Sequence, residues 1–206
     1  MDKRAEQKAK TRKKLIDCAL ELSATKGFAA LSIREVAQAA EVTPAAFYRH
    51  FRDMEELGLC LVDEIAVSLR RLLRNSRKES MTKDLRGISE FTTESFLVYV
   101  NDNSNLFRLL LGERQGASDS FRRAIRKEMD IFVVELTEDL ERIAKGRNYS
   151  LRNPAFAAEA VVTIVFTLGA EALDLPKFKQ DNLKMRIVEE VNMIIRGARM
   201  PNKKSR

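Results

Sequence analysis

The residue types that carry most enzyme and metal chemistry are scarce in this chain of 206 residues. It has one histidine, His50, and two cysteines, Cys18 and Cys60, which stand far apart in the sequence. Such a set cannot assemble a multi-ligand His/Cys metal site or a disulfide framework. Neither a Gly-rich phosphate loop nor a pairing of nucleophile and base is visible. We therefore expect no catalytic residue, no metal and no cofactor.

The charge favours a different kind of chemistry, the binding of a polyanion. Lys and Arg number 37 against 30 Asp and Glu, so the formal charge is +7 and the isoelectric point about 9.5. Much of the surplus lies in residues 1–14, where seven basic side chains accompany two acidic ones. A basic front end is typical of proteins that bind nucleic acid.

Helices must position these residues. Apolar residues recur at helical spacing through most of the chain, and no stretch sustains the alternation of a strand. We predict an all-α fold of about nine helices, separated mostly by Gly and Pro. They are expected near residues 6–26, 33–40, 44–50, 54–79, 84–101, 104–113, 118–145, 153–174 and 178–198.

Two of these helices are short and close together, which predicts a helix-turn-helix. Ser32 and Glu35 form a capping box before the first, and Thr43 with Pro44 begins the second. A second helix that starts with small residues can enter the major groove of DNA. Phe47 and Phe51, at i and i+4, should anchor it inward and turn Tyr48, Arg49, His50 and Arg52 outward.

The outward side chains can contact DNA in several ways. Hydroxyl, imidazole and guanidinium groups can bind phosphates, guanidinium groups can also reach base edges, and small residues can meet thymine methyl groups. The predicted DNA contacts are Lys10, Arg12, Ser32, Arg34, Thr43, Ala45, Ala46, Tyr48, Arg49, His50 and Arg52.

The front of the chain resembles the N-terminal domain of the TetR family of repressors. The residues that carry the resemblance are 27–37, 42–51 and the Glu55-Glu56-Leu57 run. It implies a homodimer of all-helical subunits, in which three helices read DNA and a C-terminal body holds an effector pocket and the dimer interface. It also implies DNA contacts at Ser32, Arg34, Thr43, Ala45, Ala46, Tyr48 and His50.

Two positions depart from that family's pattern. Glu41 occupies the turn where glycine is common, so we expect a strained positive φ there, at a cost of about 1 kcal/mol, or a differently built turn. Met54 replaces the usual lysine at the start of the fourth helix, and Arg52 is the expected substitute for its phosphate contact. We place a DNA-binding domain at residues 1–53, with its motif at about 33–52, and an effector-binding and dimerisation domain at 54–206.

The larger domain resembles the FabR and DesT branch, regulators of unsaturated fatty-acid synthesis. The resemblance rests on residues 105–118 and 121–125, together with 47–59, 160–166 and 169–174. It implies a fatty-acyl effector carried on coenzyme A or acyl carrier protein. The residues expected to hold it are Phe91, Phe96, Tyr99, Phe107, Leu110, Arg114, Phe132 and Phe166, with Arg108, Arg122 and Arg123 also near the carrier's phosphates.

The segment 155–170 is apolar on nearly every face and must be covered on all sides. It is interrupted by Glu159 and is short for a membrane span, and the first residues are too polar for a signal peptide. We therefore expect a cytoplasmic protein with no membrane partner. Residues 153–198 are expected to form an isologous four-helix dimer interface. The basic residues Arg196, Arg199, Lys203, Lys204 and Arg206 are expected to form a solvated tail.

The expected function is a transcriptional regulator, most simply a repressor of unsaturated fatty-acid biosynthesis genes. Three alternatives stay open. One is a related repressor of an efflux or other operon with a different apolar or cationic ligand, which acidic residues in the pocket would favour. The others are an acyl-binding enzyme with a basic arm, and a nucleoid protein that binds DNA without sequence preference.

Overall fold

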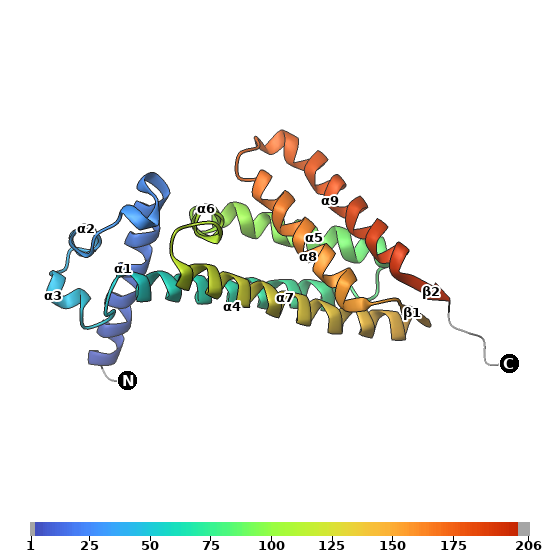
Figure 1. Cartoon of the computed structure of the whole chain (residues 1–206), viewed down its shortest axis with the longest axis horizontal. Coiled ribbons are helices and arrows are strands. Elements are labelled where there is room, and N and C mark those ends of the chain that lie inside the picture. Colours follow the sequence, from blue (N-terminus) through green and yellow to red (C-terminus); the bar gives the residue numbers. More distant parts are fainter. Residues whose placement is uncertain (1–2, 202–206) are drawn as a thin grey trace. The chain divides into compact units, whose positions relative to one another are not determined.

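The computed structural model describes residues 3–201, and its helical architecture confirms the all-α prediction (Figure 1). Nine α-helices lie in this range, as the periodicity predicts. Their bounds are α1 Lys3–Lys26, α2 Ile33–Ala39, α3 Pro44–Phe47, α4 Met54–Glu79, α5 Leu85–Asp102, α6 Ser104–Arg114, α7 Asp119–Gly146, α8 Pro154–Glu171 and α9 Lys177–Ala198, with a 3-10 turn η1 at Phe28–Ala30. Of the expected tail, Lys203, Lys204 and Arg206 lie outside the described residues.

A two-stranded ribbon corrects the expectation that the chain has no strand. β1 (Tyr149–Leu151) pairs antiparallel with β2 (Arg199–Pro201), and Ser150 lies opposite Met200. Strands of three residues are too short to show alternation in the sequence. Asn148 and Asn153 flank β1 with positive φ angles of 57° and 48°, which turn the chain out of α7 and into α8.

Contacts divide the chain into two compact units. The first holds residues up to 66 and 103–126, and the second holds 67–102 and 127 onward, so α4 and α7 contribute to both. In the first unit, α1 packs against α2, η1 and α6. In the second, α9 packs against both α5 and α8. These units are defined by contacts, whereas the boundary expected at 53/54 separates DNA binding from effector binding and dimerisation. That functional boundary stays a prediction.

Close packing in each unit depends on a glycine within a helix. In the first unit, Gly58 lies under the rings of Phe28 and Phe121, whose centroids are 5.4 Å apart, and a Cβ at Gly58 would overlap both. In the second unit, Gly169 of α8 leaves room for the ring of Phe96, which a Cβ would also overlap. These glycines allow ring and backbone to approach at the distances of a packed core.

The apolar helix α8 has 18 residues and is long and apolar enough, by length and composition, to cross a membrane. The expectation that this segment is too short is therefore wrong. Core helices of proteins that never enter a membrane pass the same test. Large apolar side chains of α8 and α9 remain exposed, among them Phe156, Met185 and Met193. Exposed apolar surface of this kind is typical of a protein–protein interface.

Candidate nucleic-acid interface and effector cavity

The start of α2 is held by the predicted capping box. The Glu35 N–H donates to Ser32 Oγ at 3.3 Å, and the Ser32 N–H donates to Glu35 Oε2 at 3.0 Å. Lys26 donates to Glu35 Oε1 at 2.6 Å, and this bond, with those from Ser32, lowers the pKa of Glu35 to about 2. The Ser32 hydroxyl also donates to Glu35 Oε2, so its proton is already used within the cap and a DNA contact would have to share it.

The turn between α2 and α3 takes the strained form. Glu41 has φ 56°, in the left-handed region that favours glycine. Its carboxylate accepts a bond from Lys14 Nζ at 2.5 Å, which lowers the pKa of Glu41. After the turn, Thr43 Oγ1 accepts the Ala46 N–H at 3.2 Å and caps α3. The Thr43 hydroxyl donates no hydrogen bond to any described residue, so its proton is available to a phosphate oxygen.

The orientation of α3 follows from its two phenylalanines. Phe47 and Phe51 are buried, as predicted, with ring centroids 5.7 Å apart. The helix itself ends at Phe47 rather than at residue 50, and Tyr48 to His50 form a turn. Tyr48 is 58% exposed, and Arg49 is exposed beside it.

Six of the predicted DNA contacts fall into two groups, exposed residues and arginines already paired within the chain. Lys10, Arg34, Ala45 and Arg49 are exposed, and within residues 3–201 none of these three cations has an ion pair. Others are occupied within the first unit: Arg12 donates to Cys60 Sγ at 2.7 Å and to Glu64 at 3.1 Å, and it lies over the Phe51 ring. Arg52 donates to Asp53 at 2.9 Å.

His50 is half-buried rather than turned outward. Its Nδ1 is buried and has no hydrogen-bond partner in the described part of the chain. Burial lowers the pKa of His50, and the charges of Lys8, Arg12 and Arg49 lower it further. Three cations and burial thus act together to lower the pKa of the imidazole, and an incoming phosphate would act in the opposite direction.

The second unit contains an apolar cavity of about 90 Å³. Three of the predicted effector residues line it, Phe96, Phe132 and Phe166, and the Phe166 ring lies 5.5 Å from Phe96 and 5.2 Å from Phe132. Two polar atoms in its wall lack a hydrogen-bond partner among the described residues, Thr92 Oγ1 and Glu135 Oε2. The cavity therefore offers a mostly apolar surface with a hydroxyl and a carboxylate oxygen.

The other predicted effector residues lie elsewhere. Phe91 is 38% exposed with Lys83 near its ring, and Tyr99 is half-buried outside the cavity wall. Phe107, Leu110 and Arg114 belong to the first unit. Arg122 and Arg123 also lie there, and both pair with Asp119. A role for these residues in effector binding stays a prediction.

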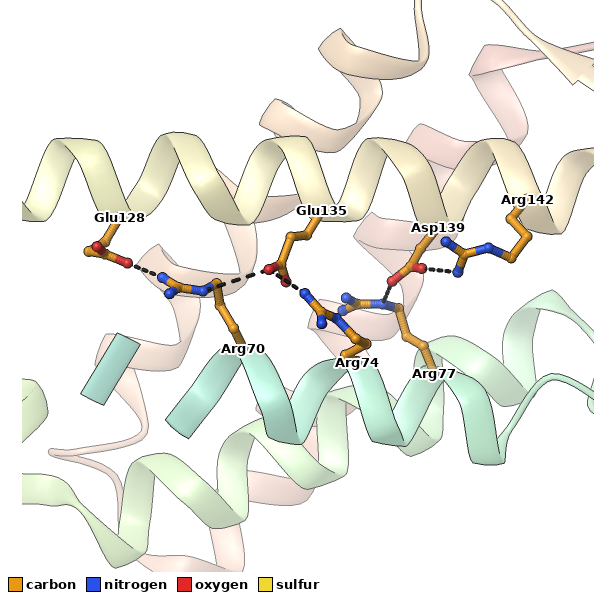
Figure 2. Close-up of polar contacts among 7 residues, drawn as sticks. All are labelled: Arg70, Arg74, Arg77, Glu128, Glu135, Asp139 and Arg142. Atoms are coloured by element: carbon orange, nitrogen blue, oxygen red, sulfur yellow. Dashed lines mark hydrogen bonds and ion pairs between the residues drawn. The ribbon is translucent and has the colours of Figure 1, made fainter. Parts of the chain in front are cut away.

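A ladder of ion pairs joins α4 to α7 beside the cavity (Figure 2). Arg70 pairs with Glu128 and lies 3.7 Å from Glu135. Arg74 pairs with Glu135, and Arg77 with Asp139, each at 2.5 Å, while Arg142 pairs with Asp139 from the other side. The side chains of Arg70, Arg77, Glu128, Glu135 and Asp139 are all less than 20% exposed.

Sequence reasoning missed this ladder, although a signal for it exists. Arg70, Arg74 and Arg77 follow the i, i+4, i+7 spacing of one helix face, and Glu128, Glu135 and Asp139 share one face of α7. Charges at such spacing usually indicate a solvated face. Only the pairing of two helices distant in sequence shows that all of these side chains except Arg74 are largely buried, and that Arg70, Arg77 and Glu135 also line the cavity.

Comparison with known proteins gives this geometry a context. The sequence model for bacterial regulatory proteins of the tetR family matches residues 15–59, which contain α2 and α3. A Haemophilus influenzae protein, described as an uncharacterized HTH-type transcriptional regulator, is 43% identical over 205 residues. The match covers 98% of this chain and 97% of that protein.

Solved structures share the fold at low sequence identity. A TetR-family transcriptional regulator from Streptomyces coelicolor superposes with a TM-score of 0.72 at 18% identity, covering 92% of this chain and 96% of that one. The fatty acid degradation regulator FadR from Bacillus halodurans gives a TM-score of 0.70 at 14% identity, covering 95% and 97%.

Proposed function

We propose that this chain, which belongs to the TetR family of bacterial transcriptional regulators, is a cytoplasmic repressor of unsaturated fatty-acid biosynthesis genes whose DNA binding is set by a fatty-acyl thioester. Regulators of this family bind DNA operators as dimers, and DNA binding follows from membership. The target genes and the effector are the proposal.

The observation that carries the DNA-reading part is the exposed surface of α2 and α3. The caps at Ser32 and Thr43 fix both helices, and buried Phe47 and Phe51 leave Tyr48 and Arg49 facing solvent. With Ala45 exposed at the start of α3, the end of the helix is narrow enough for the major groove. Arg34 then lies on α2, the helix that would cross the backbone.

The exposed apolar side chains of α8 and α9 support the dimer interface proposed for residues 153–198. Phe156, Met185 and Met193 are each more than half exposed within one chain. Two copies related by a two-fold axis would cover them isologously and would present two α3 helices to a palindromic operator. Sedimentation at micromolar concentration tests this, because a stable monomer there would contradict the interface.

The apolar cavity supports a fatty-acyl effector. At about 90 Å³ it is smaller than the roughly 300 Å³ and upward of typical ligand sites, so a long acyl chain must move its walls. Arg70 and Arg77 in that wall belong to α4, which runs from residue 54 in the first unit to residue 79 in the second. Displacing them from Glu135 and Asp139 would shift α4, and an effector acts only through such a difference between states. The FadR structure indicates that a regulator of fatty acid degradation uses the same fold.

One observation favours the alternative, a repressor of an efflux or other operon that answers a different apolar ligand. Glu135 Oε2 and Thr92 Oγ1 face the cavity without partners among the described residues. A ligand with an amine or hydroxyl donor would satisfy the carboxylate, whereas a neutral thioester could accept only from Thr92.

Titration of a protein–operator complex distinguishes a fatty-acyl effector from a different apolar ligand. Saturated and unsaturated acyl-CoA of equal chain length are each added, and operator release or tightening is followed by fluorescence anisotropy. A change in affinity with either acyl-CoA supports the lipid effector. If neither changes it while apolar amines do, the lipid assignment fails and the alternative holds.

A further inference from the structure

A cleft rich in arginine lies at the end of the second unit where α5 begins and α9 ends. Its volume is about 310 Å³, more than the apolar cavity has by the same measure. Arg86, Arg147, Arg196 and Arg199 line it, against one acidic residue, Asp84. These arginines come from α5, from the segment after α7, from the last turn of α9 and from the start of β2, so the fold brings them together.

Most of this positive charge has no acidic partner. The Arg196 guanidinium makes no hydrogen bond or ion pair with any residue the structure describes. Arg199 lies over the Tyr149 ring at 4.2 Å, and Arg147 donates to the neutral backbone carbonyls of Met81 and Lys83. Only Arg86 is compensated, by Glu90 at 2.9 Å and Glu189 at 2.5 Å.

A helix dipole accounts for part of this arrangement. A cation in the last turn of a helix is stabilised by the dipole, which would explain Arg196 on its own. Arg147 likewise follows the end of α7 and donates to carbonyl oxygens just beyond the end of α4, but the dipoles do not require these arginines to line one cleft. Guanidinium groups converging on one space bind phosphate oxygens through paired N–H donors.

The cleft adjoins the apolar cavity. Leu85 lines both, and along α9 Val191 and Ile195 face the cavity while Asn192 and Arg196 face the cleft. A hydrogen bond links their walls: Ser89 Oγ, which lines the cavity, lies 3.5 Å from Asn192 Oδ1, which lines the cleft. A molecule with an apolar chain and an anionic head could therefore occupy both.

We propose that the arginine cleft binds the phosphate-bearing head of an amphiphile whose chain enters the apolar cavity. This deepens the proposed function and rests on it. It moves the expected phosphate site away from Arg108, Arg114, Arg122 and Arg123 of the first unit. The phosphate could come from coenzyme A or from the phosphopantetheine arm of a carrier protein, and both present the same chemistry to the cleft.

The test measures binding to the full-length protein at one fixed ionic strength. The ligands are oleoyl-CoA, oleoyl-phosphopantetheine and the uncharged methyl oleate, and the variants are Arg196→Glu and a control, Arg152→Glu. Arg152 is exposed, lies outside the cleft and changes the net charge equally. We expect Arg196→Glu to raise the Kd of oleoyl-CoA about tenfold, with methyl oleate unchanged and the control close to wild type.

The pattern of Kd changes distinguishes the cleft proposal from the proposed function. If both phosphate-bearing ligands weaken, the cleft binds the phosphate that they share, and if only oleoyl-CoA weakens, it binds the nucleotide phosphates. If oleoyl-CoA binds all three proteins equally, the cleft proposal is overturned and the acyl effector stands. If no oleoyl ligand binds the wild-type protein, the proposed function fails together with the cleft. Circular dichroism of each variant checks that folding is unchanged.

Discussion

Two sets of arginines in this chain are used in opposite ways. Arg34 and Arg49 beside the short helices are exposed, with no ion pair among the described residues, whereas Arg70 and Arg77 are largely buried against carboxylates of α7. An exposed cation loses little by lacking a partner, but a buried one requires a partner because desolvation is costly. An outside polyanion such as DNA can therefore bind the first set, whereas the second set holds α4 to α7.

The largest effect should come from breaking the buried set. Arg70→Ala leaves Glu128 buried without its partner, and we expect a loss of about 3–5 kcal/mol in the free energy of unfolding. Urea denaturation measures it. Arg142→Ala is the control, because Arg142 is 58% exposed and its pair with Asp139 should be worth less than about 1 kcal/mol. Equal losses in both would show that the ladder is not a buried network.

The exposed set should affect DNA and not stability. Arg34→Ala and Tyr48→Phe should each weaken operator binding up to about tenfold, and Arg34→Ala should reduce the salt dependence by about one phosphate contact. Anisotropy titrations at several salt concentrations measure both, with circular dichroism to show unchanged folding. Arg71→Ala, an exposed arginine of α4, is the control. Unaltered affinity in both test variants would place the DNA surface elsewhere.

A smaller effect on stability is expected at the strained turn between α2 and α3, where Glu41 pairs with Lys14 at the surface. Glu41→Gly and Glu41→Ala both remove the contact with Lys14, but only glycine relaxes at φ 56°. We expect the glycine variant to be more stable than the alanine variant by about 1 kcal/mol in urea denaturation. An alanine variant of equal or greater stability would mean that the turn changes shape when the pair is lost.

The smallest effect concerns His50 and pH. Because burial and neighbouring cations lower its pKa in the free protein, its contribution to stability is present above the unfolded pKa of about 6.5 and is lost as pH falls. A nearby phosphate would raise the pKa, so binding should take up protons and tighten by about two- to fivefold from pH 7.5 to 6. His50→Gln should remove this tightening. The same pH dependence in wild type and variant would exclude a His50–phosphate contact.

Local chemistry made the helices, their caps and the burial of Phe47 and Phe51 predictable. The capping box at Ser32, the Thr43-Pro44 start and the i, i+4 pair of Phe47 and Phe51 each involve residues within four positions of one another. The positive φ of Glu41 is one of the two outcomes that the resemblance left open, and the structure shows which of them occurs. His50 differs because it lies in the turn after α3, and the burial of its Nδ1 could not be predicted from the local sequence.

Long-range pairing decided the rest. Phe96, Phe132 and Phe166 meet in the cavity, but nothing local separates them from Phe107, which the fold places in the other unit. The ladder of α4 and α7 and the arginine cleft likewise join segments far apart in the sequence. The short ribbon of β1 and β2 depends on residues 149 and 201 meeting, which no periodicity can indicate.

A dimer that uses the exposed surface of α2 and α3 should bind one specific operator sequence. Selection of bound duplexes from a random DNA library by the full-length protein tests it most directly. We predict enrichment of one palindrome with two half-sites about one or more helical turns apart, lost with Arg34→Ala combined with Tyr48→Phe. Recovery of no common sequence, with random DNA bound as tightly, would contradict the claim and indicate a nonspecific nucleoid protein.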